Sequence, residues 1–264
     1  MPNANEEAAM ANTVEGRIFF PGNPWPDGHR IISCELVAAI NPSRGLYTDE
    51  APYQGPALTL AIDLKTADYD EDDQSDRDAI GADDWSSKIA WNNYGSCWVG
   101  ESGSSNTPGF VVSDGIKPFS FHEEEYRFSV DTLPLDWDTF VVTQAFGTYL
   151  LGHDAVADHD IHLHSRQSDG TYTLDWTGRI ALSYVGDNEF KYGFHAHVTG
   201  VRFREIQLWY FQKERAMEYL EIDLDPMITP RDYIAPFVAD PEGFVFEERV
   251  DGLERSCFYA VPKP

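Results

Sequence analysis

Residues 159–198 read HDIHLHSRQSDGTYTLDWTGRIALSYVGDNEFKYGFHAHV, and this stretch decides the fold class. Apolar side chains recur at every second position in each of its segments, which is the pattern of strands that bury one face. Turn sequences, Ser168-Asp169-Gly170 and Gly186-Asp187-Asn188, separate the segments. The stretch therefore predicts an antiparallel β meander whose buried parity holds Ile161, Leu163, Tyr172, Leu174, Trp176, Gly178, Ile180, Leu182, Tyr184, Phe190, Tyr192, Phe194, Ala196 and Val198.

The rest of the chain adds strands upstream and a small mixed region downstream. Strand patterns cover residues 14–20, 30–40 and 58–64, and shorter ones lie near 85–91, 96–99, 110–113, 125–130 and 140–145. Helix signals are confined to the C-terminal fifth, at 212–220 and at Thr229-Pro230-Arg231-Asp232, where an N-cap hydroxyl precedes a proline; Pro236 should shorten this second helix. The tail should form a hairpin, because Asp251-Gly252 separates strand patterns at 244–250 and 253–261.

These patterns predict a mainly β fold, an antiparallel β-sandwich or flattened, jelly-roll-like barrel with a small α+β C-terminal appendix. We expect residues 1–12 to be a disordered leader and residues 13–205 to form the β domain, with an acidic loop at 68–84. Residues 206–264 should supply the short helices and the hairpin, packed on that domain.

The composition limits the partners that this chain can bind. Its 264 residues hold 45 Asp and Glu against 19 Lys and Arg, a formal net charge of −26. Such a charge argues against nucleic acids and anionic membranes, both of which attract basic surfaces. A basic protein is the partner class that the charge favours, although a high-salt habitat would also explain an acidic surface.

The cysteines and the apolar runs indicate the cellular setting. Cys34, Cys97 and Cys257 are odd in number and widely spaced, which is not a disulfide framework. No secretion signal is recognisable at the N-terminus, and no apolar run is long enough to cross a membrane as a helix. We therefore expect a cytoplasmic protein.

Two H-x-H tripeptides are the first candidate for chemistry. His162-Leu163-His164 and His195-Ala196-His197 each place two imidazoles on one strand face, opposite the apolar parity. Imidazole is a common ligand of divalent zinc, iron and copper, so these four histidines are candidate metal ligands. In a simple meander the two pairs would lie roughly 10–14 Å apart, too far for one ion unless the sheet closes or the strand order differs from the chain order. The alternative is two solvated histidine pairs, or a pH sensor.

The first tripeptide resembles half of a cupin signature, in which H-x-H is followed by a glutamate. The glutamate is missing here, Asp169 is the nearest acid downstream of His164, and the second cupin motif has no counterpart. The resemblance implies a metal-dependent enzyme with His162, His164, His195 and His197 as its metal ligands.

Two further segments suggest a calcium-dependent carbohydrate-binding module. Asp68, Asp70 and Asp72 have the spacing that opens many calcium loops, but Asp73 and Ala79 stand where an EF-hand needs glycine and glutamate. The aromatic side chains that could stack on a sugar, beside the amides of Asn92 and Asn93, are Trp85, Trp91, Tyr94 and Trp98. The competing interpretation is that Trp85, Ile89 and Trp91 share one strand parity and belong to the core.

No motif of a known nucleophilic, phosphate-binding or zinc-protease site occurs in the sequence. The sequence therefore favours a non-enzymatic binding or protein-interaction module. The alternatives are the cupin-like metal-dependent enzyme and the carbohydrate-binding module. A divalent metal is the only cofactor suggested, and the oligomeric state stays open.

Overall fold

The computed structural model describes residues 14–41, 56–71, 83–100, 109–208, 228–250 and 256–263. The expected leader, the helix expected at 212–220 and residues 72–82 of the acidic loop lie outside the described residues. The strands are β1 (Glu15–Phe19), β2 (His29–Asn41), β3 (Ala57–Thr66), β4 (Trp98–Gly100), β5 (Phe110–Ser113), β6 (Tyr126–Val130), β7 (Gly147–Tyr149), β8 (Ala155–His164), β9 (Tyr172–Ala181), β10 (Tyr192–Leu208), β11 (Phe244–Val250) and β12 (Ser256–Pro262). The helices are α1 (Lys88–Tyr94), α2 (Trp137–Thr143) and α4 (Pro230–Ile234), with 3-10 turns η1 (Asp84–Ser86), η2 (Ser183–Val185) and η3 (Pro241–Gly243).

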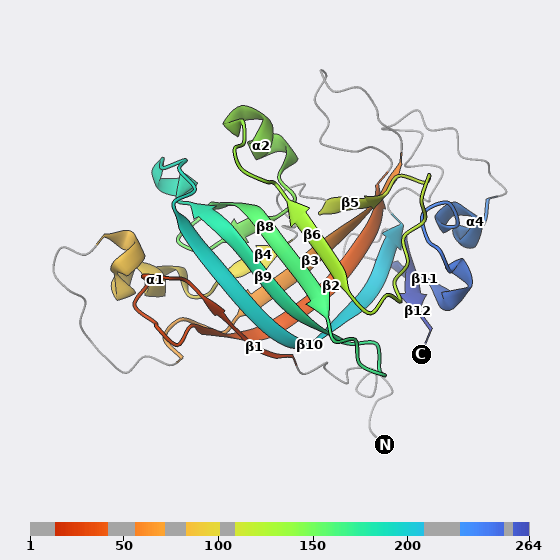
Figure 1. The fold of residues 1–264 in the computed structure, drawn as a ribbon, viewed down its shortest axis with the longest axis horizontal. Helices are drawn as coiled ribbons and strands as arrows, with labels where there is room; N and C mark the ends of the chain where they lie inside the picture. The colour runs from red at the N-terminus through yellow and green to blue at the C-terminus, as the bar shows by residue number, and fades with distance from the viewer. Residues whose placement is uncertain are drawn as a thin grey trace.

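All twelve of these strands belong to one sheet, whose main path runs β6-β8-β9-β10-β1-β2-β3-β4-β7. The long strand β10 folds this sheet over. Its first part pairs antiparallel with β9 and β1, whereas its second part pairs parallel with β2 and antiparallel with β12. Between these parts lies Gly200, with φ of +79°, where the register with β9 shifts as at a β-bulge. The result is two layers, β6-β8-β9-β10 in front of β2-β3-β4 in Figure 1.

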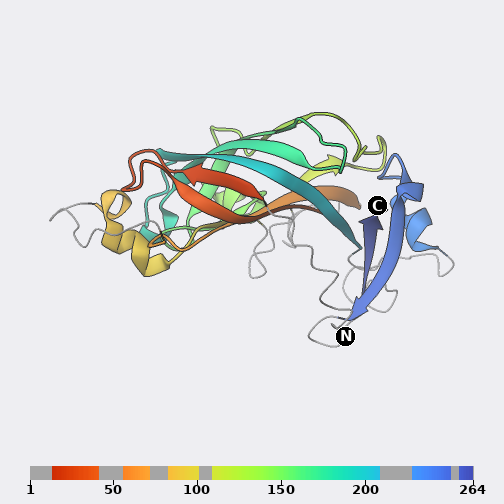
Figure 2. The same ribbon diagram turned by 90° about the horizontal axis from the view of Figure 1, so that it is seen from below.

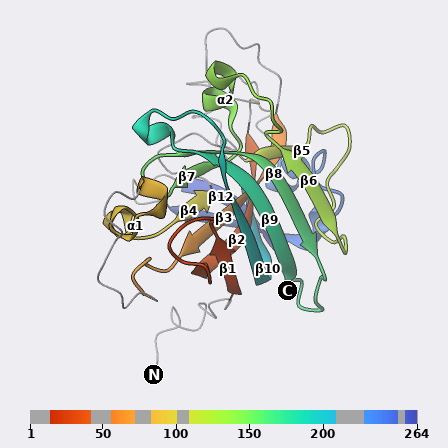
Figure 3. The same ribbon diagram turned by 60° about the vertical axis from the view of Figure 1, so that its left-hand side comes forward.

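The predicted fold class is confirmed: the chain is mainly antiparallel β and forms an open, flattened barrel. Figure 3 shows the two layers on either side of the interior. The interior holds one side-chain parity of each layer, including Ile18, Ile62, Leu64, Leu174 and Trp176, each fully buried. Among the described residues, no helix is long and apolar enough to cross a membrane.

Aromatic side chains fill one end of the barrel. Trp91 from α1 packs against Phe20, Trp25 and Tyr69, with ring centroids 5.1–6.1 Å apart. The prediction of a strand at 85–91 is therefore wrong, because the segment lies in η1 and α1. Ser87 instead caps α1 by accepting a hydrogen bond from Ala90 N at 3.1 Å. The helix exposes 61% of Ile89 while Trp85 and Trp91 are buried.

The strand expected at 140–145 is also wrong, because this segment mostly lies in α2. Asp136 caps α2 by accepting from Thr139 N at 3.0 Å. Phe140 then packs on Ala155, Ala157 and Ala181, on the outer face of β8 and β9. Helix is thus not confined to the C-terminal fifth.

The C-terminal elements agree with the sequence pattern where they are described. Thr229 and Asp232 form a capping box at α4, which ends at Ile234, before Pro236. Strands β11 and β12 pair as a hairpin, and β12 joins β10 through Ile206 and Ala260. Figure 2 shows the hairpin standing beside one end of the barrel.

Ion pairs add to this attachment of the hairpin. Glu205 on β10 is only 3% exposed and accepts from Arg204 at 3.0 Å and from Arg249 on β11 at 2.6 Å. A buried carboxylate needs such partners, so removal of one arginine should be strongly unfavourable.

Candidate metal centre

The outer face of β8, β9 and β10 carries the predicted histidines. Ile161 and Leu163 of β8 point into the core, so His162 and His164 point outward. The strand register places His162 opposite Asp175 on β9, and Asp175 opposite His197 on β10. One polar row therefore crosses three adjacent strands on the face opposite the core.

Asp175 lies at the centre of this row and binds two histidines. His164 Nε2 lies 2.8 Å from its Oδ2, and His197 Nδ1 lies 2.6 Å from its Oδ1. Partial burial raises the pKa of Asp175, but the hydrogen bonds from His197 and His164 outweigh it and hold the pKa below its usual value. Asp175 is therefore an ionised carboxylate at neutral pH.

His162 stands beside His164, with their ring centroids 4.5 Å apart. Its Nε2 lies 2.8 Å from Oε1 of Glu125, which also accepts from Arg127 Nε at 2.9 Å. These bonds from Arg127 and His162 lower the pKa of the exposed Glu125 carboxyl. A second carboxylate thus orients the ring of His162.

Together these contacts bring three metal-ligating side chains to one place. One ligand atom from each of His162, His164 and Asp175 lies within 4.8 Å of the other two. Bonds of about 2.0–2.1 Å to a tetrahedral zinc ion require ligand atoms about 3.3 Å apart, so small side-chain adjustments suffice. Their side chains are 21%, 27% and 48% exposed, which leaves an approach from solvent.

The structure brings together only some of the four predicted histidine ligands. His162 and His164 converge, and His197 reaches the same group through the far oxygen of Asp175. His195 does not join them, because its ring stacks on Phe19 at 4.5 Å between centroids. The strand order follows the chain order here, so β9 lies between the two pairs, as expected for a meander.

Sequence reasoning missed Asp175. Its outward parity in β9 was readable, but it is one of 45 acidic residues in the chain. Only the pairing of β8 and β10 with β9 distinguishes it from the others, and pairing is not visible in a local pattern.

The other sequence candidates do not form a comparable group. Asp68 and Asp70 are exposed in the segment after β3, and Asp72 lies outside the described residues. Trp85 and Trp91 are buried, as the core interpretation predicted, so their ring faces contact other side chains. Trp98 donates its indole N–H to Asp63 Oδ1 at 2.6 Å.

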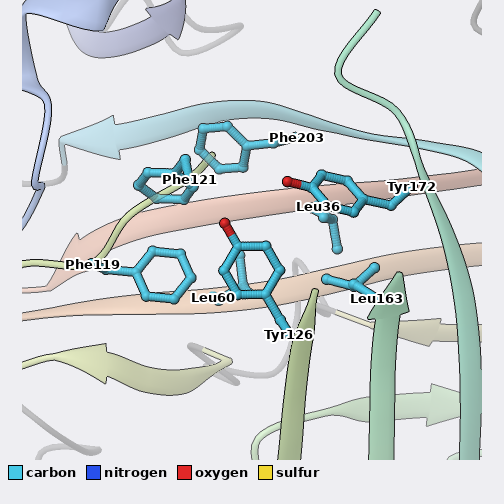
Figure 4. Close-up of a pocket in the computed structure, with 8 residues that line it drawn as sticks. All are labelled: Leu36, Leu60, Phe119, Phe121, Tyr126, Leu163, Tyr172 and Phe203. Atoms are coloured by element: carbon cyan, nitrogen blue, oxygen red, sulfur yellow. The ribbon is translucent and has the colours of Figure 1, made fainter. Parts of the chain in front are cut away.

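A small apolar pocket lies on the inner side of the same strands (Figure 4). It is narrow: the space open to the centre of a water molecule is about 10 Å³, room for about one water. The lining residues are Leu36, Leu60, Phe119, Phe121, Tyr126, Leu163, Tyr172 and Phe203. Leu163 lies between His162 and His164 in the chain, so the pocket and the histidine group occupy opposite faces of β8.

Comparison with protein-family models, with curated proteins and with solved structures found no match for this chain. The site is therefore interpreted from its own geometry.

Proposed function

We propose that this chain is a binding protein for a divalent transition-metal ion, held by His162, His164 and Asp175. The convergence of three ligand atoms from two paired strands carries the proposal. Two imidazoles and one carboxylate form a ligand set that suits zinc, iron, nickel or copper better than calcium or magnesium, which prefer oxygen alone. With three protein ligands, a tetrahedral ion would keep one position for water or an external ligand.

The partners of the ligands support the same function. Metal-binding side chains are commonly oriented by hydrogen bonds from residues behind them, and the loss of such a residue costs about 10–100-fold in affinity. Here His197 holds Oδ1 of Asp175, which leaves Oδ2 on the side of His164. Glu125 holds the ring of His162 in the same way.

A titration of metal-free protein with Zn²⁺, followed by calorimetry or by competition with a coloured chelator, tests this proposal. We expect one equivalent to bind to the wild type, and His164→Ala or Asp175→Asn to weaken binding by about 100-fold or more, beyond the usual cost of losing an orienting partner. The matched control is His195→Ala, which removes a histidine from the same sheet face but not from the group. The proposal is wrong if the wild type binds no equivalent of Zn²⁺, Ni²⁺ or Cu²⁺, or if the control loses as much affinity as His164→Ala.

A binding role without catalysis agrees with the sequence, which contains no recognised catalytic motif. The cytoplasmic setting and a basic protein partner also stay predictions. Cys34 and Cys97 support the first, since both are buried free thiols whose pKa is raised by burial. The negative net charge supports the second, and a pulldown at low and high salt would test it.

A further inference from the structure

We propose that the ion held by His162, His164 and Asp175 takes a small carboxylate in its open position, and that Arg127 binds the second oxygen of this carboxylate. The inference rests on the proposed function, because without the ion nothing in the site takes the first oxygen. It adds the class of ligand that the bound ion accepts and one further binding residue.

Arg127 lies beside the metal ligands on the neighbouring strand. Strand β6 pairs with β8, and the register sets Arg127 directly opposite His162. Figure 1 shows β6 alongside β8. Residues directly opposite one another in an antiparallel pair point to the same face of the sheet, with Cβ atoms about 4.5–5.5 Å apart. The guanidinium of Arg127 therefore extends over the same outer face as the ring of His162, and its side chain is 64% exposed.

Glu125 fixes the guanidinium next to this ring. Its Oε1 accepts a hydrogen bond from Arg127 Nε at 2.9 Å and lies 2.8 Å from His162 Nε2. This contact uses only the Nε of Arg127. Within the part of the chain that the structure describes, no acceptor binds the two terminal amino groups of Arg127. Those groups are free to donate to a ligand beside the ion.

The charges around the site favour an anion only when the ion is present. Histidines that bind a metal are neutral, so Asp175, Glu125 and Arg127 together leave one negative charge in excess. A divalent ion reverses this to one positive charge. Two further charges on the outer face, Asp160 on β8 and Arg17 on β1, offset each other. The loaded site is thus locally positive in a chain whose net charge is −26.

This local charge and the shape of the guanidinium select a carboxylate. One positive charge is neutralised by a monoanion, whereas a phosphate dianion would leave an excess of negative charge. Arginine presents a planar set of N–H donors that matches the plane of a carboxylate. The side chains of His162, His164 and Asp175 are partly exposed, so the rest of a bound molecule would extend into water. Recognition is therefore limited to the carboxylate group itself.

The test uses protein loaded with one equivalent of Co²⁺, whose visible absorption reports both its binding and a change in its ligands. Acetate is the probe, and acetamide is its neutral control of the same size. We expect acetate to change the absorption with saturation and a Kd on the order of 1–10 mM. Acetamide should cause no change, and calorimetry should detect no acetate binding to metal-free protein.

Two arginine variants locate the second contact. Arg127→Gln should bind Co²⁺ as the wild type does but weaken acetate binding about tenfold or more, because a charge-assisted hydrogen bond is lost. The matched control is Arg179→Gln, at an exposed position on the outer face of β9 where the side chain donates to Phe190 O. It removes the same charge from the same face and should leave the Kd for acetate unchanged.

The first step of the test separates this inference from the proposed function. If no equivalent of Co²⁺ binds, the metal site itself is wrong. If Co²⁺ binds but acetate leaves its absorption unchanged, only the carboxylate inference is overturned. It is also overturned if acetamide acts like acetate, or if Arg127→Gln and Arg179→Gln weaken acetate binding equally.

Discussion

The two faces of β8, β9 and β10 are built from alternate residues of the same strands, yet they differ in burial and in the kind of contact that their side chains form. On the inner face Ile161, Leu174 and Trp176 are fully buried and contact other apolar groups. On the outer face Asp175 and His197 keep about half of their side-chain surface in water and form hydrogen bonds. Apolar burial on the inner face should therefore supply most of the free energy of unfolding, whereas substitutions on the outer face should lower it only slightly.

Histidines show the contrast within one strand. His159 lies on the inner face, 2% exposed, and its Nδ1 accepts from Trp176 Nε1 at 3.2 Å. Burial lowers the pKa of His159 to about 3, so it is neutral in the core. His162, further along the same strand and on the outer face, instead pairs with a carboxylate. Residue type alone does not determine the role; the face does.

Removal of the central inner side chain should have the largest effect. Trp176 is fully buried and packs on Phe146 and Phe194, with ring centroids 4.9 and 5.4 Å away. We expect Trp176→Ala to lower the free energy of unfolding by about 3–5 kcal/mol, which denaturant unfolding would measure. A loss below about 1 kcal/mol would mean that the inner face is not the main source of stability.

Acid should destabilise the inner face through His159. A histidine in the unfolded chain has a pKa near 6.5. Between pH 6.5 and about 3, His159 therefore binds a proton in the unfolded chain but not in the folded one. The contribution of His159 to the free energy of unfolding is fully present above about pH 6.5, and it falls by about 1.4 kcal/mol per pH unit below that pH. His159→Gln keeps an acceptor for Trp176 and should show a shallower slope between about pH 6.5 and 5. Equal slopes for the two proteins would contradict a neutral, buried His159.

The smallest effect on stability should come from the centre of the outer face. Asp175→Asn removes the charge that binds His164 and His197 at a half-exposed position, and should cost no more than about 1 kcal/mol at about pH 7 in metal-free protein. The same variant should bind Zn²⁺ about 100-fold more weakly or worse under the proposed function, so the two measurements separate function from folding. A loss of more than about 3 kcal/mol would show that this row holds the sheet together.

Much of the fold was predictable because alternation is a local signal. The strands around Ile18, Ile62 and Trp176 follow directly from a period of two. Helices α1 and α2 were missed because each has only seven residues and its apolar spacing also fits a strand. Packing decided in favour of helix, since Trp91 fills the end of the barrel and Phe140 covers the alanines of β8 and β9.

The site was predictable in part for the same reason. Parity placed His162 and His164 on one outward face, and the structure agrees. It could not show that His195 stacks on Phe19 while His197 reaches Asp175, because both contacts depend on the strands that flank β10.

The sequence by itself determined which face of its strand each of these side chains occupies, because the period of two is a property of the extended backbone. Only the tertiary structure decided which residues meet across strands. Register depends on strand order and on irregularities such as the shift between Ala157 and Asp160, near Asp158 with φ of +54°. A slip of one residue would turn every side chain of a strand to the other face, so burial of the core over the whole sheet selects one register. That register brings Asp175 between His164 and His197.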